Sequence, residues 1–170
     1  MNNQFIIKVK YTKQLENGTF KRVSENFLFF AHTFTDAETR VYEELGSIIR
    51  GEFQVVSITR AEFHDIFHYE ECDVWYKATI SFKSEGDDMN KAKNVKQNFL
   101  ISAVSVKDTD TKLKESLQGL MVDYTIDGIV VTNLVDIYPF NEDLDRELSR
   151  TMPEESDYEE NGVEAVDMLP

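Results

Sequence analysis

The sequence has few of the features that stabilise secreted proteins or anchor membrane proteins. Among 170 residues there is one cysteine, Cys72, so an intramolecular disulfide is impossible and a reducing cytoplasm is expected. No stretch approaches the roughly 18 apolar residues that a membrane helix requires. Residues 1–10 contain no apolar segment followed by small residues, so we expect no signal peptide. These absences predict a cytoplasmic protein that does not enter the membrane.

The sequence also lacks the motifs of common catalytic sites. It contains no G-x-S-x-G, G-x-x-x-x-G-K or G-x-G-x-x-G string. Its carboxylates are concentrated on predicted helix faces and in the C-terminal region, where solvation explains them. We therefore expect a protein without enzymatic activity and without a cofactor.

Two histidines are the main candidates for metal binding. His64 and His68 occupy positions i and i+4, and Glu70, Glu71 and Cys72 follow. This spacing would suit zinc if the segment were helical. The pattern places no third ligand, and surface histidines are the more common explanation. We assign no metal ligand, and we expect Cys72 to be a small buried hydrophobe.

The chain has fewer positive than negative charges, and most of the excess negative charge lies in one segment. The net charge is −14, and the segment 141–170 holds eleven acids against two arginines. This C-terminal segment therefore carries −9, which leaves only −5 for the part of the chain that precedes it. The charge of the whole chain is a poor guide to the surface of its folded part.

The two halves of the sequence are similar to each other. Asn26-Phe27-Leu28 recurs as Asn98-Phe99-Leu100, and Asp65-Ile66-Phe67 recurs at nearly the same offset as Asp136-Ile137-Tyr138. Apolar positions and potential helix caps between these strings keep the same spacing. The pattern predicts a tandem duplication.

Each copy has the same order of predicted elements. In the first, residues 5–11 alternate as a strand, Asn17-Gly18 predicts a type I′ hairpin turn, and residues 20–31 return as a second strand. Thr33 or Thr35 caps a helix that Gly51 ends. A strand over 54–60 follows, and residues 63–69 form a short strand or turn.

The helices are identified by their apolar stripes. The first helix has Ala37, Val41, Leu45 and Ile48 on one side, and the second, over 108–121, has Leu113, Leu117 and Leu120. In the second copy, alternation from Tyr76 to Phe82 predicts the first strand and a polar loop over 84–92 replaces the tight turn. The other second-copy strands are expected over 93–103, 124–131 and 134–138.

These elements predict an α+β fold with two copies of a ββαβ unit, two helices and a mostly antiparallel sheet. Copy one covers residues 1–73 and copy two covers 74–140, together forming one globular domain. Each small unit exposes an apolar sheet face that its helix cannot cover. Two copies related by a pseudo-twofold axis would bury these faces against each other.

Lysines concentrate on the predicted hairpins of both copies, and aromatic residues are interleaved with them. Lysines can neutralise phosphates and exposed rings can stack on bases, which is how single-stranded nucleic acid is held without sequence reading. We expect the two hairpins to lie side by side and form one continuous cationic surface. The residues assigned to nucleic-acid binding are Lys8, Lys10, Phe20, Lys21, Arg22, Trp75, Lys77, Lys93 and Lys96.

A structural explanation of the same residues is also available. Phe5, Tyr11, Tyr76 and Phe82 are in phase with apolar neighbours and are expected in the core, and strand lysines on a solvated face are ordinary. Trp75, which is out of phase with that apolar set, and Phe20, at the hairpin edge, are the rings expected to be exposed.

From residue 141 the periodicity disappears, and the composition predicts a disordered acidic tail. Its apolar tip ends in Asp167, Met168, Leu169 and Pro170. The tail resembles those of bacterial and phage single-stranded-DNA-binding proteins, which recruit replication partners and compete with DNA for the basic surface. The resemblance implies that these four residues bind replication proteins. The alternative is a tail that only confers solubility.

Several strings resemble an uncharacterised family of Bacteroidota and their crAss-like phages, catalogued as a domain of unknown function. They are Val9-Lys10-Tyr11-Thr12-Lys13, Glu16-Asn17-Gly18, Gly51-Glu52-Phe53 and Asp136-Ile137-Tyr138-Pro139. The resemblance covers about residues 4–140 and implies phage or mobile-element DNA metabolism in a bacterial host cell. In outline the chain is also similar to the single-stranded-DNA binders PC4 and Whirly, although in those four strands usually precede the helix and here about two do.

Two functional hypotheses follow. The first is a non-enzymatic, sequence-independent single-stranded-DNA-binding protein whose tail recruits partners. The second is a protein-interaction module, a host-takeover or counter-defence factor, that uses its acidic surface to bind a basic partner. The sequence leaves open DNA versus RNA, and whether the chain forms a homodimer.

Overall fold

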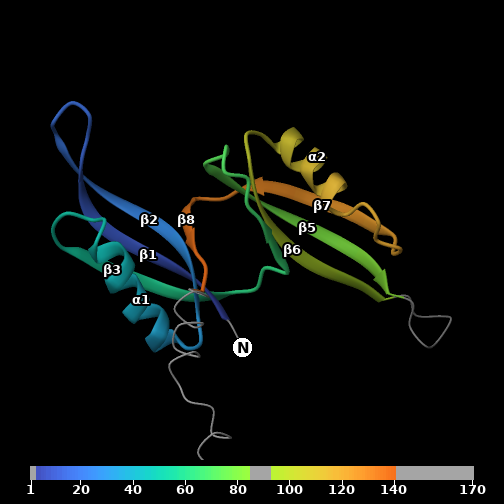
Figure 1. Ribbon diagram of the computed structural model, residues 1–170, viewed down its shortest axis with the longest axis horizontal. Helices are drawn as coiled ribbons and strands as arrows, with labels where there is room; N and C mark the ends of the chain where they lie inside the picture. Colours follow the sequence, from blue (N-terminus) through green and yellow to red (C-terminus); the bar gives the residue numbers. More distant parts are fainter. Residues whose placement is uncertain (1–2, 85–92, 141–170) are drawn as a thin grey trace, which may run out of the picture. The chain divides into compact units, whose positions relative to one another are not determined.

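A computed structural model of the chain describes residues 3–84 and 93–140, which fold into strands and two helices (Figure 1). The elements in chain order are β1 (Asn3–Gln14), β2 (Phe20–Ala31), α1 (Phe34–Gly46), β3 (Phe53–Ala61), β4 (Asp65–Phe67), β5 (Val74–Ser84), β6 (Lys93–Ala103), α2 (Val106–Ser116), β7 (Tyr124–Val131) and β8 (Leu134–Tyr138). The predicted α+β class is confirmed, and a two-stranded hairpin precedes each helix. Neither helix in the described ranges is long and apolar enough to span a membrane.

The strands form two four-stranded sheets. Sheet A has the order β3-β1-β2-β8, and sheet B has the order β4-β6-β5-β7. In sheet A, β1 pairs with β2 and β3, and in sheet B, β5 pairs with β6 and β7. All four pairings are antiparallel. The fourth strand is parallel to its neighbour.

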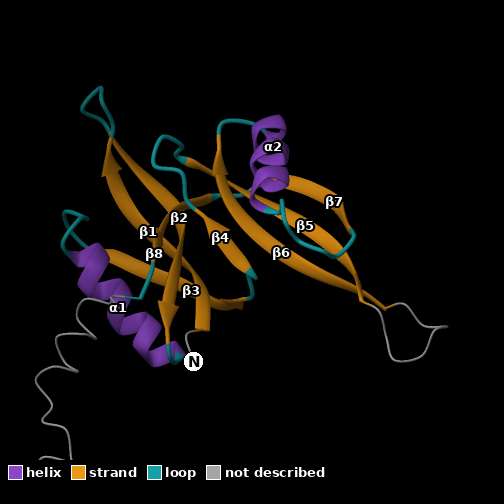
Figure 2. Cartoon of the chain, turned by 45° about the vertical axis from the view of Figure 1, so that its right-hand side comes forward, coloured by secondary structure: helices purple, strands orange, loops and turns teal. Residues whose placement is uncertain are grey.

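The fourth strand of each sheet comes from the other half of the chain. β8 pairs with β2, although it follows β7 of sheet B in sequence, and β4 pairs with β6, although it follows β3 of sheet A (Figure 2). The two exchanges have the same register, since Phe27 lies opposite Asp136 and Phe99 lies opposite Asp65. The halves are therefore joined by two backbone hydrogen-bond ladders.

Each exchanged strand also adds an aromatic ring to the core of the sheet that it joins. Tyr138 of β8 stacks on Phe29, with ring centroids 4.6 Å apart. Phe67 of β4 stacks on Phe99, with centroids 6.0 Å apart. The exchange is thus held by side-chain packing as well as by the backbone.

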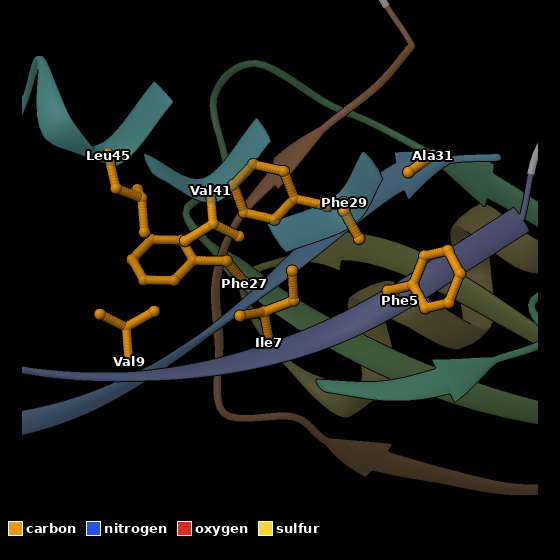
Figure 3. Packing of buried hydrophobic residues seen from close by; sticks show 9 residues of the cluster. Phe5, Ile7, Val9, Phe27, Phe29, Ala31, Val41 and Leu45 are labelled. Atoms are coloured by element: carbon orange, nitrogen blue, oxygen red, sulfur yellow. The ribbon is translucent and has the colours of Figure 1, made fainter. Parts of the chain in front are cut away.

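The core of sheet A is formed by the alternating apolar residues of the hairpin. Phe5, Ile7 and Val9 of β1 point toward α1, as do Phe27, Phe29 and Ala31 of β2, and Ala37, Val41 and Leu45 of the helix close over them (Figure 3). Thr33 caps α1 by accepting a hydrogen bond from the Asp36 N–H, at 3.1 Å.

Sheet B is built in the same way. Ala78 and Ile80 of β5 and Phe99 and Ile101 of β6 pack against Leu113 and Leu117 at the α2 side. Ser105 caps α2 through the Asp108 N–H, at 3.0 Å. The register shift of the β1–β3 pair, between Lys8 and Val9, has its equivalent in the β5–β7 pair, between Thr79 and Ile80.

A third cluster joins the two sheets on the faces that the helices leave free. It contains the buried residues Leu28, Trp75, Leu100 and Leu134. We call this cluster the junction. Leu28 and Leu100 lie near the open ends of the two hairpins, away from their turns, so the junction covers one end of each helix-free face. The expectation that sheet faces bury each other holds at this end.

Several local expectations were wrong at element ends. α1 ends at Gly46 rather than at Gly51, and Ile48, expected on the buried stripe, is 63% exposed. α2 ends at Ser116, and Leu120 is 50% exposed rather than inward. Both residues lie beyond the last turn, where the helical period no longer applies.

The first hairpin turn also differs from the predicted type. Gly18 has a positive φ of 83°, but Asn17 does not, so the turn is not type I′. The Gly18 N–H donates to the Leu15 carbonyl and the Leu15 N–H to the Thr19 carbonyl. This is a longer hairpin loop with glycine at the left-handed position, and the Asn17 side chain accepts from the Thr19 N–H.

The junction predicts a large effect of truncating its central residue. Leu28 is fully buried between the sheets, so Leu28→Ala should lower the free energy of unfolding by about 2–5 kcal/mol. Ile48→Ala, which removes the same kind of side chain from an exposed site, should change it by about 0.5 kcal/mol or less. Urea titration measures both, and equal effects would contradict the assignment of the junction.

Candidate nucleic-acid interface

The outer half of the first hairpin carries the densest positive charge of the described structure. We call this part, Lys8–Gln14 of β1 and Phe20–Asn26 of β2 with the turn between them, arm A. It contains five cations against Glu16 and Glu25. The five cations are Lys8, Lys10, Lys13, Lys21 and Arg22.

Strand alternation divides these cations between the two sides of arm A. Ile7 and Val9 point toward α1, so Lys8 and Lys10 point to the opposite, helix-free side. Their cross-strand partners are Asn26 and Ser24, and Arg22 lies opposite Thr12. No carboxylate is present among these β1 and β2 residues. This helix-free side of arm A is therefore cationic and otherwise neutral.

On the α1 side of arm A, Glu25 contacts Tyr11 and Lys13. Glu25 accepts a hydrogen bond from the Tyr11 hydroxyl at 2.7 Å and lies 3.8 Å from the Lys13 ammonium. Lys13 lies directly opposite Lys21 across the strands, and like charges in that position are unfavourable. Glu25, beside Lys13, partly offsets this repulsion.

Phe20 lies where β2 begins, beside the turn of arm A, and is 72% exposed. Its predicted exposure is confirmed. The ring borders a groove of about 640 Å³ between arm A, the end of α1 and β8. Phe27, Leu45 and Tyr138 also line the groove, and Lys13 and Arg50 lie at its rim. An exposed ring next to cations suits stacking against a base.

The second hairpin has a comparable but less cationic surface. We call Lys77–Lys83 of β5 and Asn94–Asn98 of β6 arm B. Lys83 and Lys96 are each at least partly exposed and Lys77 is half-buried. Alternation places all three on the side opposite Ala78 and Ile80, which face α2.

The neutral groups of arm B are partly engaged with each other. The Thr79 hydroxyl donates to the Asn98 side-chain oxygen at 3.0 Å, and the Ser81 hydroxyl donates to Asp127 of β7. The helix-free side of arm B therefore differs from that of arm A in having one carboxylate, Asp127, beside its lysines.

The predicted stacking role of Trp75 is wrong. Trp75 is only 4% exposed because it belongs to the junction, where Leu28 of sheet A and Leu134 of β8 cover it. The His68 ring stacks on it, with centroids 5.4 Å apart. Because Trp75 is out of phase with the residues that face α2, its assignment to the helix-free face was correct. Sheet A buries the helix-free face of sheet B at this point.

The two arms do not form one continuous cationic surface. Figures 1 and 2 show the β1–β2 turn and the outer ends of β5 and β6 on opposite sides of the structure. The junction packs the other ends of β2, β5 and β6 together. The expected side-by-side arrangement is therefore wrong, and the hypothesis that depends on a single track fails in that form. Lys8, Lys10 and Arg22 belong to one surface, and Lys77 and Lys96 belong to another.

Residues 3–140 match the family DUF4494, described as a domain of unknown function. The chain belongs to the DUF4494 family. No curated protein sequence matches it. The family match covers both sheets, so both arms and the junction lie inside the DUF4494 domain.

The remaining predicted residues of this DUF4494 chain lie on the α1 side of arm A or outside the described part of the structure. Lys21 is exposed on the α1 side of arm A, opposite Lys13. Lys93 begins β6, but its side chain lies outside the described part. The four tail residues, Asp167, Met168, Leu169 and Pro170, and the loop over 85–92, also lie outside the described residues.

The histidines and the cysteine have structural contacts. The segment holding His64 and His68 includes strand β4 rather than a helix, and the ring centroid of His64 lies 5.2 Å from that of Phe99. Within 3–84 and 93–140 no group of three metal-ligating side chains is found. Cys72 is buried, and the Lys112 ammonium lies 3.3 Å from its sulfur and 3.0 Å from Asp108.

Two lysines of the arms were not among the residues predicted from the sequence. Lys13 lies on arm A and Lys83 on arm B, both with side chains that reach solvent. Lys83 follows the same alternation as Lys77, so the period of two was sufficient to find it. The groove beside Phe20 had no sequence signal, because it depends on where α1 ends relative to β8.

Tyr11 has a raised pKa because its phenol is partly buried and lies beside Glu25. Burial of the phenol, then the hydrogen bond to Glu25 and the charge of Glu25, raise the pKa of Tyr11 from 10.0 to about 12. In the unfolded chain this phenol would ionise at a pKa of about 10. Between these pH values the folded state holds more protons, so stability falls as pH rises through this window.

An ultraviolet titration of phenolate absorbance tests this assignment. Tyr11→Phe should remove a phenolate that forms at a pH of about 12, and should weaken the loss of stability above pH 10. Glu25→Gln should lower the pKa of Tyr11 but leave it above 10, since burial is the larger cause. Tyr42→Phe, at a half-exposed ring, serves as the control. A Tyr11 phenol that ionises like a free one in the folded protein would contradict the contact.

Proposed function

We propose that this protein binds single-stranded DNA without sequence preference and without catalysing a reaction, and that the helix-free side of arm A is the principal site. One observation carries the proposal. In a chain with a net charge of −14, Lys8, Lys10 and Arg22 share a strand surface that no helix covers and to which β1 and β2 contribute no carboxylate.

The chemistry of this surface suits a polynucleotide backbone. Three cations spaced along two strands match a row of phosphates, and the hydroxyl and amide groups of Thr12, Ser24 and Asn26 between them can hydrogen-bond to phosphate and sugar oxygens. Phe20 adds one exposed ring at the tip of arm A, beside the groove on its α1 side. Because these contacts are to the backbone and to a base face, they read no sequence.

The proposal includes a tandem duplication as the origin of the fold. It is supported by the matched strand orders, the register shifts at equivalent positions of β1 and β5, the equivalent caps Thr33 and Ser105, and the reciprocal exchange of β4 and β8. The role in phage or mobile-element DNA replication rests on the sequence resemblance, as does recruitment of replication proteins by the tail.

Charge reversal on arm A is the direct test. Lys8→Glu/Lys10→Glu should weaken binding to labelled oligothymidylate at least about tenfold in fluorescence anisotropy, because two phosphate contacts are replaced by repulsion. With about three phosphates contacted, the wild-type slope of log affinity against log salt should be about −2, and the variant slope should be shallower.

The matched control keeps the net charge change but moves it to α2. Lys107 and Lys114 are exposed on that helix, and Lys107→Glu/Lys114→Glu should change affinity by less than about threefold, the scale of a screened long-range effect. Equal losses in both variants would show that only the total charge matters and would refute arm A as the site.

Phe20→Ala separates stacking from charge. Loss of a stacked base should cost on the order of 1–3 kcal/mol of binding free energy while leaving the salt slope unchanged, since no phosphate contact is removed. An unchanged affinity would exclude Phe20 from the interface. Anisotropy at two salt concentrations measures both quantities.

Removal of residues 141–170 tests the electrostatic role of the C-terminal segment. A chain ending at Phe140 keeps every described residue and loses a charge of −9, so it should bind oligonucleotide more tightly than the full chain, most clearly at low salt. If the shortened chain shows no gel shift at low salt, the proposed function is wrong.

A second candidate is supported by the outer surface of α1. Asp36, Glu38 and Glu43 are exposed there, and Phe34 and Tyr42 are each about half exposed. An acidic surface with two rings suits a basic protein partner, as expected for a host-takeover or counter-defence factor. Capture of a basic protein that is lost in Glu38→Lys/Glu43→Lys, without any oligonucleotide binding, would favour this candidate.

A further inference from the structure

We propose that one chain holds two separate segments of single-stranded nucleic acid, one on each arm, and thereby bridges them. This inference rests on the proposed function and extends it from binding to bridging. The observation behind it is that the two cationic surfaces are divided by the junction rather than joined.

The junction prevents one strand from following both surfaces. On sheet A the helix-free side changes from Lys10 and Lys8 to Ile6 and Leu28, and Leu28 is fully buried against sheet B. On sheet B the same side changes from Lys96 and Thr79 to Leu100 and Trp75, which are buried as well. A strand lying on either arm therefore meets packed protein at the junction and cannot continue onto the other arm across it.

Each arm is long enough to hold a short segment by itself. The strand from Lys8 to Gln14 extends about 20 Å at roughly 3.3 Å per residue, which suits a few nucleotides. Arm B has the equivalent length from Lys77 to Lys83. Its three lysines match the three helix-free cations of arm A in number, although Asp127 stands beside Ser81, so we expect arm B to bind more weakly.

The directions of the arms make the two sites independent. Because the β1–β2 turn and the outer ends of β5 and β6 lie on opposite sides (Figure 1), a short oligonucleotide that covers one arm does not reach the other. Two short oligonucleotides should thus bind one chain, and two long strands should be held together by it. Linking two modest sites in one chain raises the avidity for a long strand or a strand pair.

Stoichiometry gives the first measurement. Titration of the full chain at low salt with oligothymidylate of about ten nucleotides should saturate at two oligonucleotides per chain. The arm A variant Lys8→Glu/Lys10→Glu and the arm B variant Lys83→Glu/Lys96→Glu should each saturate at one. If a charge-reversal variant fails to fold, as judged by thermal unfolding, glutamine substitutions at the same positions replace it.

Bridging gives the second measurement. Wild-type protein should retain fluorescent oligothymidylate on beads that carry immobilised oligothymidylate, where base pairing between the two is impossible. Each single-arm variant should bind its oligonucleotide but retain at most about a tenth of the wild-type signal. An equimolar mixture of the two variants should also fail, because bridging requires both arms in one chain.

The outcomes separate this inference from the function on which it rests. Saturation at one oligonucleotide with no effect of the arm B variant would overturn bridging and leave binding by arm A intact. Bridging by the mixture of variants would also overturn it, since association of chains would then supply the second site. No binding by any form of the protein would overturn the proposed function itself.

Discussion

The reciprocal exchange of β4 and β8 is the constraint on which the arrangement of the whole domain depends. Each sheet is complete only with a strand from the other half, and that strand inserts an aromatic ring, Tyr138 or Phe67, into the recipient core. The exchange brings β2 and β6 toward each other at the ends that carry Leu28 and Leu100. The junction forms there, and it decides which parts of the helix-free faces stay exposed.

The distribution of charge follows from the same arrangement. Lysines on the covered ends of the faces would be buried without partners, which is costly, so apolar residues occupy those positions and the lysines occupy the outer halves of the hairpins. On sheet A the opposite face is acidic, since α1 carries Asp36, Glu38, Glu43 and Glu44 against Arg40. On sheet B it is not, because the acids and lysines of α2 are equal in number.

Much of the secondary structure was predictable from the sequence, but the way in which the halves meet was not. The sequence predicted β6, β7 and β8 with their observed bounds, and Thr33 was one of the two predicted caps of α1. α2 begins at Val106, two residues before the predicted start at residue 108. The pairing of β4 involves only three residues, and so short a strand is defined by its neighbour and not by its own period. The burial of Trp75 was missed for a related reason, because a period of two assigns a residue to a face but does not say whether a second sheet covers it. Most cations of the two helix-free surfaces were predicted, but Lys83 was left out and Lys21 lies on the α1 side. The separation of the surfaces depends on the junction, for which the sequence had no signal.

The exchanged strands also have a consequence for how the domain comes apart. Melting of either sheet removes a hydrogen-bonded edge from the other and withdraws a ring from its core. Neither half can then act as an autonomous folding unit, and the free-energy cost of opening is shared between them. Such coupling favours a single all-or-none transition over stepwise loss of the halves, so the domain should keep both hairpins in place until it unfolds entirely.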